Sequence, residues 1–265
     1  DNMALRGATA KAVAPRTGVV CSAIEHHAVL NTAKAMRDEG RPSVIARVDG
    51  SGVLDLTDLA TKVDDTTAVV SVMLANNETG ALQPVPEAAG IARVHGALVH
   101  CDAVQAAGKV PVDVRALDAD LLTLSAHKLY GPKGVGCLYV RRGTRMAPLV
   151  RGGGQERNRR AGTENVAGLV GFGAAATLAG EGLEVERARL AALRERLEGR
   201  LLAIPGALRN GGERRLPNTA NLSFEGTESE ALLIALDLEG IAVSTGAACA
   251  AGGVDVNMEM VAGGF

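Results

Sequence analysis

The chain has 265 residues, of which 47% are hydrophobic, so it is long enough to bury one large core or two unequal domains. Its 28 basic and 30 acidic residues give a formal net charge of -2, which argues against a surface for nucleic acid or an anionic membrane. Four widely spaced cysteines form no CxxC pair, which argues against a zinc ribbon or a disulfide framework and favours free thiols in a reducing compartment.

The first 140 residues alternate between short apolar runs typical of buried strands and segments with helical periodicity. Strands are predicted at 19–24, 44–48, 68–74, 97–101 and 120–124, and helices at 27–39, 56–63 and 86–95. A further strand-like run follows the turn-rich GPKGVG segment at 131–136. Because the strands are almost entirely apolar and alternate with helices, we predict an α/β domain with a mainly parallel sheet flanked by helices.

The pattern changes after residue 171. A long helix is predicted at 181–204, followed by a strand at 220–224, a helix at 228–239 and a strand at 241–244. We expect the long helix to bury a stripe of leucines in the core: Leu190, Leu193, Leu197 and Leu201. The sequence therefore predicts a large domain over residues 1–180 and a smaller C-terminal α+β domain over residues 181–265.

Polar residues cluster after four of the predicted strands. They are Glu25, His26 and His27; Asn76, Asn77 and Glu78; Asp102 and Gln105; and Ser125, His127 and Lys128. Each has an ordinary structural explanation on its own, such as a helix N-cap, a turn residue, a satisfied core histidine or a solvated lysine. Ligands of open α/β sheets bind outside the carboxyl ends of the strands, so the coincidence of these groups at one edge predicts a binding site there.

The chemistry of these side chains matches the needs of pyridoxal phosphate. This cofactor requires a lysine that forms a Schiff base and a carboxylate on its pyridinium nitrogen, and Lys128 and Asp102 can supply them. The flat ring of His26 can stack on the cofactor. Ser125 and His127, with nearby glycine-rich turns, can donate hydrogen bonds to its phosphate.

Six ordered segments carry a family resemblance: EHHAVL, MLANNETG, HCDAVQAAGK, SAHKLYGPKGVGCLYVRR, GGGQERNRRAGTEN and STGAACAAG. In this order and at these separations they resemble the cysteine desulfurases of the NifS/IscS-like group, which are fold-type-I pyridoxal-phosphate enzymes of the class V aminotransferase family. The resemblance extends from Asp1 to about Gly253. It implies a pyridoxal-phosphate-dependent transferase fold with a large cofactor-binding domain.

The resemblance also implies roles for individual residues. Lys128 would form the Schiff base, Asp102 would pair with the pyridinium nitrogen, and His26 would stack on the ring and act as an acid or base. The remaining cofactor contacts would come from Asn77 and Gln105 beside the phenolate oxygen, from Ser125 and His127 at the phosphate, and from Thr163 at the phosphate of the partner subunit's cofactor. A homodimer would therefore be part of the active site, with the arginine-rich segment 151–160 near its interface.

Cys249 lies in STGAACAAGG, whose small residues and glycines are typical of a mobile loop. In the resembled family, the thiolate of this loop attacks the sulfur of the cofactor-bound L-cysteine, giving alanine and a protein persulfide. The persulfide sulfur would pass to a scaffold or carrier protein for iron–sulfur cluster or thio-cofactor assembly. For Cys21, Cys101 and Cys137 we expect only the role of small buried hydrophobic residues.

The chain departs from the family pattern at both ends. It opens on Asp1 and Asn2 without the Gly-Thr-Glu-Ser turn that cups the cofactor phosphate in the family, and it stops at Phe265 before the arginine that grips the substrate carboxylate. We therefore expect a fragment lacking both ends, with incomplete domains. No signal peptide or membrane-spanning apolar run is present, so a cytoplasmic protein with no membrane or nucleic-acid partner is expected.

Two alternative functions stay open at this point. The first is a related pyridoxal-phosphate lyase or aminotransferase, such as a selenocysteine lyase, that shares Lys128 and Asp102 and does not rely on Cys249. The second is a truncated and inactive homologue that only dimerises or binds a partner.

Overall fold

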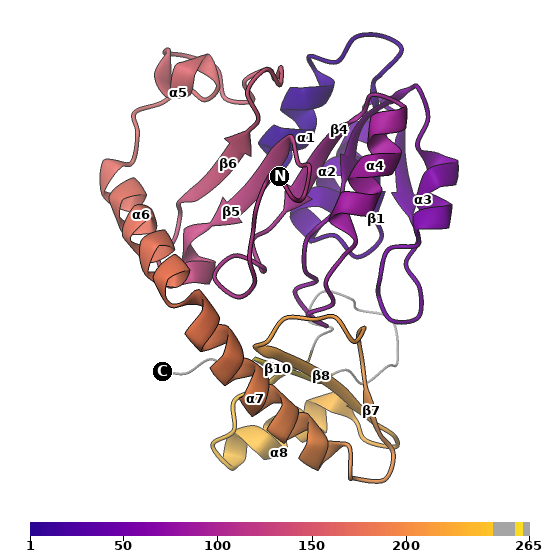
Figure 1. The fold of residues 1–265 in the computed structure, drawn as a ribbon, viewed down its shortest axis with the longest axis vertical. Coiled ribbons are helices and arrows are strands. Elements are labelled where there is room, and N and C mark those ends of the chain that lie inside the picture. The colour runs from indigo at the N-terminus through magenta and orange to yellow at the C-terminus, as the bar shows by residue number, and fades with distance from the viewer. Residues whose placement is uncertain (246–257, 262–265) are drawn as a thin grey trace.

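The computed structural model describes residues 1–245 and 258–261, which contain two β-sheets (Figure 1). The larger sheet has the order β2-β1-β3-β4-β5-β6 and comprises β1 (Gly18–Ser22), β2 (Ser43–Ala46), β3 (Thr67–Ser71), β4 (Leu98–Asp102), β5 (Leu121–Ser125) and β6 (Gly136–Val140). Every neighbouring pair is parallel except β5 and β6. The mainly parallel sheet predicted from the sequence is confirmed.

The antiparallel edge strand β6 follows from the short connection after β5. Only residues 126–135 join the two strands, and they form the short helix η1 (Ala126–Leu129) and a turn. A parallel crossover needs a dozen or more residues, so the chain turns back beside β5. The consequence is that Lys128 lies in a tight turn between two paired strands.

Both faces of the larger sheet are covered by helices. On one face, α1 (Asn2–Thr9) and α2 (His27–Asp38) pack against Val19, Val69 and Leu121. On the other, α3 (Leu56–Lys62) and α4 (Val85–Val94) pack against Val20, Val70, Val99 and Leu122. Successive residues of one strand point to opposite faces, so each strand contributes to both cores. This second core also contains three alanines of α4 and the alanine directly before β4: Ala88, Ala89, Ala92 and Ala97.

The smaller sheet is antiparallel and has the order β7-β8-β10-β9. Its strands are β7 (Ala207–Arg209), β8 (Thr219–Phe224), β9 (Ser244–Thr245) and β10 (Met258–Val261), and α7 (Leu183–Leu201) and α8 (Ser229–Leu238) accompany it. Two sheets thus lie on either side of residue 181, although the division into domains at that position stays a prediction. Figure 1 shows the smaller sheet below the larger one. Helix α6 (Val166–Glu181) lies beside the larger sheet and leads into α7, which lies beside the smaller one.

The helices differ from the sequence prediction in two respects. The long helix predicted at 181–204 is confirmed as α7, but a second helix, α6, which precedes it at an angle of 68°, was not predicted. The sequence of α6 is rich in glycine and alanine and has no polar face, so periodicity does not reveal it. The leucines of α7 are also not buried: Leu193 is exposed and the other three are half-buried, since the described residues cover this helix mainly through α6 and β8.

No single helix among the described residues is long and apolar enough to cross a membrane. Only α6 and α7 taken together, which are bent by 68° relative to each other, have the length and apolar composition of a membrane-spanning segment. Buried core helices can have the same length and composition.

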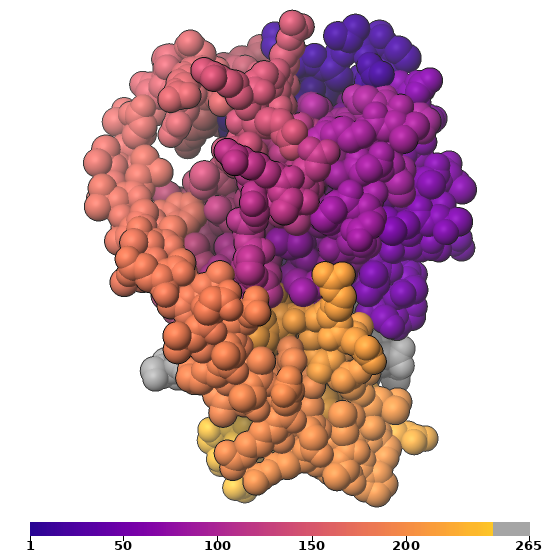
Figure 2. Space-filling view, viewed as in Figure 1, coloured from indigo at the N-terminus to yellow at the C-terminus, as the bar shows by residue number. Residues whose placement is uncertain are grey.

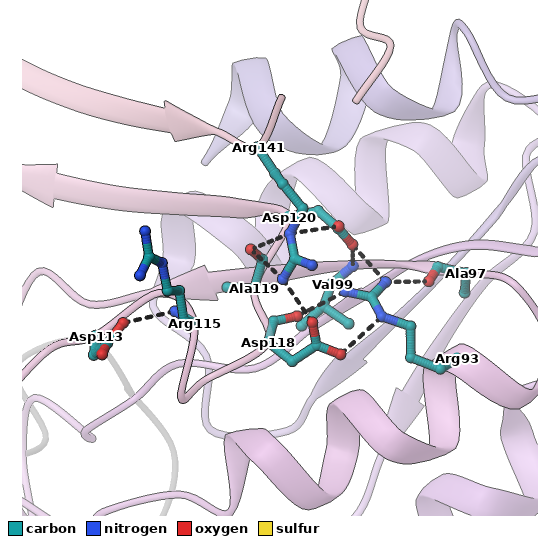
Figure 3. A network of polar contacts seen from close by, with 9 residues as sticks. All are labelled: Arg93, Ala97, Val99, Asp113, Arg115, Asp118, Ala119, Asp120 and Arg141. Atoms are coloured by element: carbon teal, nitrogen blue, oxygen red, sulfur yellow. Dashed lines mark hydrogen bonds and ion pairs between the residues drawn. The ribbon is translucent and has the colours of Figure 1, made fainter. Parts of the chain in front are cut away.

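A cluster of paired charges holds α4 to the amino ends of β4 and β5 (Figure 3). Asp120 accepts hydrogen bonds from Arg93 Nη1 at 2.6 Å and from the backbone N–H of Val99 at 2.8 Å. Arg141, just after β6, lies 3.3 Å from Asp120 and donates to Asp118 at 2.6 Å. The Asp120 side chain is 7% exposed and that of Asp118 is 42% exposed, so Asp120 makes the more important ion pairs.

We expect Asp120→Ala to lower the free energy of unfolding by about 2–4 kcal/mol, because it leaves the Val99 N–H and two arginines without their buried acceptor. Asp118→Ala is the matched control and should cost about 1 kcal/mol or less, because its ion pairs are open to solvent. Urea unfolding of both variants measures the difference. Equal losses would show that burial of the Asp120 carboxylate does not matter.

Candidate active site

The predicted strand-end residues lie at the carboxyl edge of the larger sheet. His26 follows β1, Asn77 follows β3, Asp102 ends β4, and Ser125 ends β5. The strands β1, β3, β4 and β5 are consecutive neighbours and all parallel, so their carboxyl ends are adjacent. The structure therefore brings these four polar segments to one edge, as the sequence predicts.

Asp102 is a buried carboxyl group beside His26. Its side chain is 5% exposed, and its Oδ1 accepts a hydrogen bond from the backbone N–H of Val104 at 2.9 Å. Burial raises the pKa of Asp102, while the Val104 N–H, the α-ammonium of Asp1 and His26 act in the opposite direction. A buried carboxyl of this kind is suited to a cationic partner, because a positive charge would stabilise its ionised form.

Glu25 is a second buried carboxyl group at the same edge, and no role was predicted for it. It is 4% exposed, and the backbone N–H of Met73 donates to its Oε1 at 2.5 Å. Its Oε2 has no hydrogen-bond partner among the described residues. Burial raises its pKa well above the usual range, and Asp102 raises it further, whereas the Met73 bond lowers it. An acidic residue directly after an apolar strand was the sequence signal for this group.

The segment that continues β3 is bonded to both neighbouring strands' ends. The Met73 N–H donates to the Glu25 carboxyl group, and the N–H of the next residue, Leu74, donates to the backbone carbonyl of Asp102 at 2.8 Å. This segment leads directly to Asn76. The loop carrying Asn77 is therefore held from both neighbouring strands.

Asn76, rather than Asn77, shapes the loop after β3. The buried Asn76 side chain accepts hydrogen bonds from the backbone N–H groups of Glu78 and Thr79 and donates to the Ile24 carbonyl at 3.1 Å. The predicted cofactor-binding residues Asn77 and Gln105 are half-buried. Within residues 1–245 and 258–261, their side chains make no hydrogen bond that would prevent them from contacting a ligand.

Ser125, His127 and Lys128 share the turn that ends β5. Ser125 Oγ and His127 Nδ1 are 2.7 Å apart and share a hydrogen bond. Lys128 is exposed, and among the described residues it forms no ion pair. The turn closes at Tyr130, whose φ of 60° lies in the left-handed region, and Gly131 then donates its N–H to the Ala126 carbonyl. The two phosphate-binding candidates and the lysine are thus held in one short helical turn.

Thr163 and Lys128 do not line the same cavity. Thr163 is exposed and lines a cavity of about 800 Å³ between β5, β6 and residues 156–165, whose lining does not include Lys128. Figure 2 shows this region as an opening between the salmon-coloured loop and the magenta body of the protein. The prediction that Thr163 reaches a partner's cofactor stays untested.

The arginine-rich loop is exposed and has an unusual backbone. Its short helix α5 (Gln155–Asn158) contains Glu156, Arg157 and Asn158 with φ between 49° and 61°, in the left-handed region that non-glycine residues rarely adopt. Cys137 lines the same cavity and is exposed, so the prediction of a buried thiol was wrong for this residue. It is on the edge strand β6, where no further strand covers it. Cys21 and Cys101 are buried as predicted.

Cys249, the predicted sulfur acceptor, lies outside the described residues. The remaining predicted site residues are all described, and the structure assigns them positions rather than roles. Among the described residues, no group of three or more His, Cys, Asp or Glu side chains could hold a metal ion.

Comparison with known proteins assigns the chain to a family. A family model described as aminotransferase class-V matches residues 1–262, and the chain belongs to this family. It is 48% identical over 258 residues to a cysteine desulfurase of Gluconacetobacter diazotrophicus, covering 96% of this chain and 64% of that protein. It is 49% identical over 247 residues to the cysteine desulfurase NifS of Azotobacter vinelandii, covering 92% of this chain and 61% of that protein.

Solved structures agree with this assignment. A NifS-like protein superimposes with a TM-score of 0.90 at 37% identity, covering 98% of this chain and 73% of that chain. A NifS-like protein from Rickettsia africae has a TM-score of 0.86 at 28% identity, covering 98% of this chain and 72% of that one. The predicted fold-type-I transferase fold is confirmed. The chain spans 61–65% of the length of the curated relatives named cysteine desulfurase that it matches.

His100 ties three strands together just below the site. This fully buried imidazole shares hydrogen bonds with Ser71 of β3 at 2.8 Å and Thr123 of β5 at 2.9 Å. Burial and, to a smaller extent, the α-ammonium of Asp1 lower its pKa to about 3. Its contact with the Asp1 carboxylate at 3.5 Å is therefore not an ion pair at neutral pH.

We expect His100 to make the protein less stable as the pH falls below about 6.5. In that range the unfolded chain binds a proton that folded His100 excludes down to a pKa of about 3, so stability present above 6.5 is lost on acidification. At one pH unit below 6.5 the loss from this group is about 1.4 kcal/mol. Urea unfolding as a function of pH measures it, and His100→Gln should flatten the slope between about pH 6.5 and 5. The same slope in both proteins would contradict the assignment.

Proposed function

We propose that this chain carries the core of a pyridoxal-phosphate-dependent cysteine desulfurase, which removes sulfur from L-cysteine and leaves alanine and a persulfide on Cys249. The observation that carries the proposal is Asp102, a buried carboxyl beside His26, which ends the strand next to β5, and the turn with Lys128 directly follows β5. The names of its relatives and its membership of the aminotransferase class-V family support it.

The side chains at this edge fit pyridoxal phosphate. Asp102 is a buried acceptor for the pyridinium N–H. The exposed imidazole of His26 caps α2 by accepting the Ala28 N–H at 3.1 Å, and its ring face would stack on the cofactor. Asn77 and Gln105 have amide groups available for the ring oxygen. Ser125 and His127, which share a hydrogen bond, would donate to the phosphate, and Thr163 of the partner subunit in a homodimer would complete that contact.

The cofactor, when bound, withdraws electrons from the substrate and so makes its α-carbon acidic and its Cβ–Sγ bond reactive. Lys128 would hold the cofactor and, once its amine is free, accept the α-proton and return it. His26 would serve as a second acid or base near the same atoms. These residues orient the substrate and move protons, whereas none of them accepts the sulfur atom.

Cys249 would accept the sulfur as its thiolate. A bond forms between its Sγ and the substrate sulfur, and the substrate Cβ–Sγ bond breaks. The electron pair of that bond remains on Cβ, which takes a proton and becomes the methyl group of alanine. The exchange balances without an external oxidant or reductant. We propose that the resulting persulfide passes its sulfur to an acceptor scaffold or carrier protein in the cytoplasm for iron–sulfur cluster or thio-cofactor assembly.

Replacement of Lys128 tests the cofactor assignment. The protein mixed with pyridoxal phosphate should show a visible absorbance band that survives gel filtration, and Lys128→Ala should abolish it because the covalent attachment is lost. Lys133→Ala is the matched control, since Lys133 is an exposed lysine in the following turn, and it should retain the band. A persistent band in Lys128→Ala would refute the assignment, and a band absent from the unmodified chain would favour a non-catalytic binding protein.

Replacement of Cys249 tests the sulfur acceptor. Cys249→Ser should reduce the production of alanine from L-cysteine by at least about 100-fold, because a hydroxyl group is a far weaker nucleophile at neutral pH than a thiolate. The absorbance band should remain unchanged, since Cys249 takes no part in holding the cofactor. Cys137→Ser, at an exposed cysteine on β6, is the control and should retain activity. Undiminished alanine production in Cys249→Ser would instead favour a lyase such as a selenocysteine lyase.

A further inference from the structure

A second pocket, of about 470 Å³, lies where the two sheets' supporting elements meet. Its walls come from residues 107–109 after β4, from the η1 turn, from α6 and α7, and from Asn218 directly before β8. Six residues form its apolar wall: Ala107, Leu129, Ala175, Leu178, Ala179 and Leu190. Its volume is within the range of small-molecule sites.

Two lysines that have no acidic partner among the described residues line this pocket. Lys109 is half-buried and Lys128 borders the pocket from η1, and neither forms an ion pair among the described residues. The other charged groups of the lining are Glu186 and Arg189 on α7, which pair with each other at 2.7 Å. The pocket therefore has an excess of positive charge on the side of the larger sheet.

Lys109 responds to this environment. Burial and, to a smaller extent, the charge of Lys128 lower the pKa of Lys109 to about 8. The remaining titratable groups of the lining are Tyr130, Glu186 and Arg189, and the nearby carboxylate of Glu186 is already engaged by Arg189. An anion in the pocket would relieve the repulsion between the two lysines.

Asn218 supplies an independent sign of a ligand. It is 8% exposed and lines the pocket, and its Oδ1 has no hydrogen-bond partner in the part of the chain that the structure describes. A buried amide oxygen without a donor costs about 1–3 kcal/mol, so native structures seldom leave one unused. A ligand hydroxyl group would satisfy it, whereas a ligand ammonium would be repelled by the two lysines.

We propose that this pocket binds a small hydroxycarboxylate. Its carboxylate contacts Lys109 and faces Lys128, its hydroxyl donates to Asn218, and its carbon chain packs on the apolar wall. Because the pocket joins residues of the larger sheet to α7 and Asn218, the ligand bridges the two halves of the molecule. The pocket shares Lys128 with the proposed cofactor site, whereas Lys109 and Asn218 have no part in that site, so variants of these two residues test this proposal separately.

Calorimetric titration of the purified chain with L-lactate tests the site, with propionate as the probe lacking the hydroxyl group. L-lactate should bind, and Lys109→Met should weaken its binding at least about tenfold through the loss of a charge-assisted contact. Asn218→Leu should reduce the affinity for L-lactate to that for propionate while leaving propionate binding unchanged. Lys34→Met, at an exposed lysine on α2, is the control for charge and should change neither.

Proton uptake on ligand binding tests the proposal with the unmodified protein, so it does not depend on the folding of a variant. Ligand binding should raise the pKa of Lys109, so the unmodified protein at about pH 8 should take up a fraction of a proton per L-lactate bound, and its affinity should fall at higher pH. Titration in two buffers of different ionisation enthalpy measures this uptake. No binding of L-lactate, equal binding by Lys109→Met, or binding without proton uptake would overturn the proposal.

Discussion

Burial of both faces of the parallel sheet is the constraint on which the rest of the structure depends. Neighbouring residues such as Val19 and Val20, or Leu121 and Leu122, face opposite helical layers, so both faces of these strands are closed to a ligand. Side chains that can contact a ligand are found where the strands end. Since β1, β3, β4 and β5 are adjacent and parallel, the ends carrying His26, Asn77, Asp102 and Ser125 converge on one edge.

Acidic side chains have basic partners at one edge of this sheet and lack them at the other. At the amino edge, Asp120 and Asp118 are paired with Arg93 and Arg141, and every one of these groups is stabilised within the chain. At the carboxyl edge, Glu25 and Asp102 are buried with raised pKa values and have no arginine or lysine partner among the described residues. Paired charges hold elements together, whereas buried carboxyl groups without a basic side-chain partner are available to a ligand. This contrast is what distinguishes the site from a structural cluster.

Some of this arrangement could be read from the residues and some could not. The strands of the larger sheet were predicted within a few residues because each is a short apolar run bounded by turn residues. Helix α6 was missed because its glycine and alanine residues form no polar face. Asn76 and Asn77 are indistinguishable in sequence, and only the hydrogen bonds to Ile24, Glu78 and Thr79 reveal that Asn76 shapes the loop.

By itself, the sequence determined the α/β class, the family, and which residue types could hold a cofactor, because apolar periodicity and ordered motifs are local properties of the chain. Only the tertiary structure decided which of those groups are buried, which are paired, and what lies between distant segments. Glu25 beside Asp102, and Lys109 facing Lys128 and Asn218, are examples. Burial and unmet hydrogen bonds arise from residues far apart in sequence, and a linear pattern contains no measure of either.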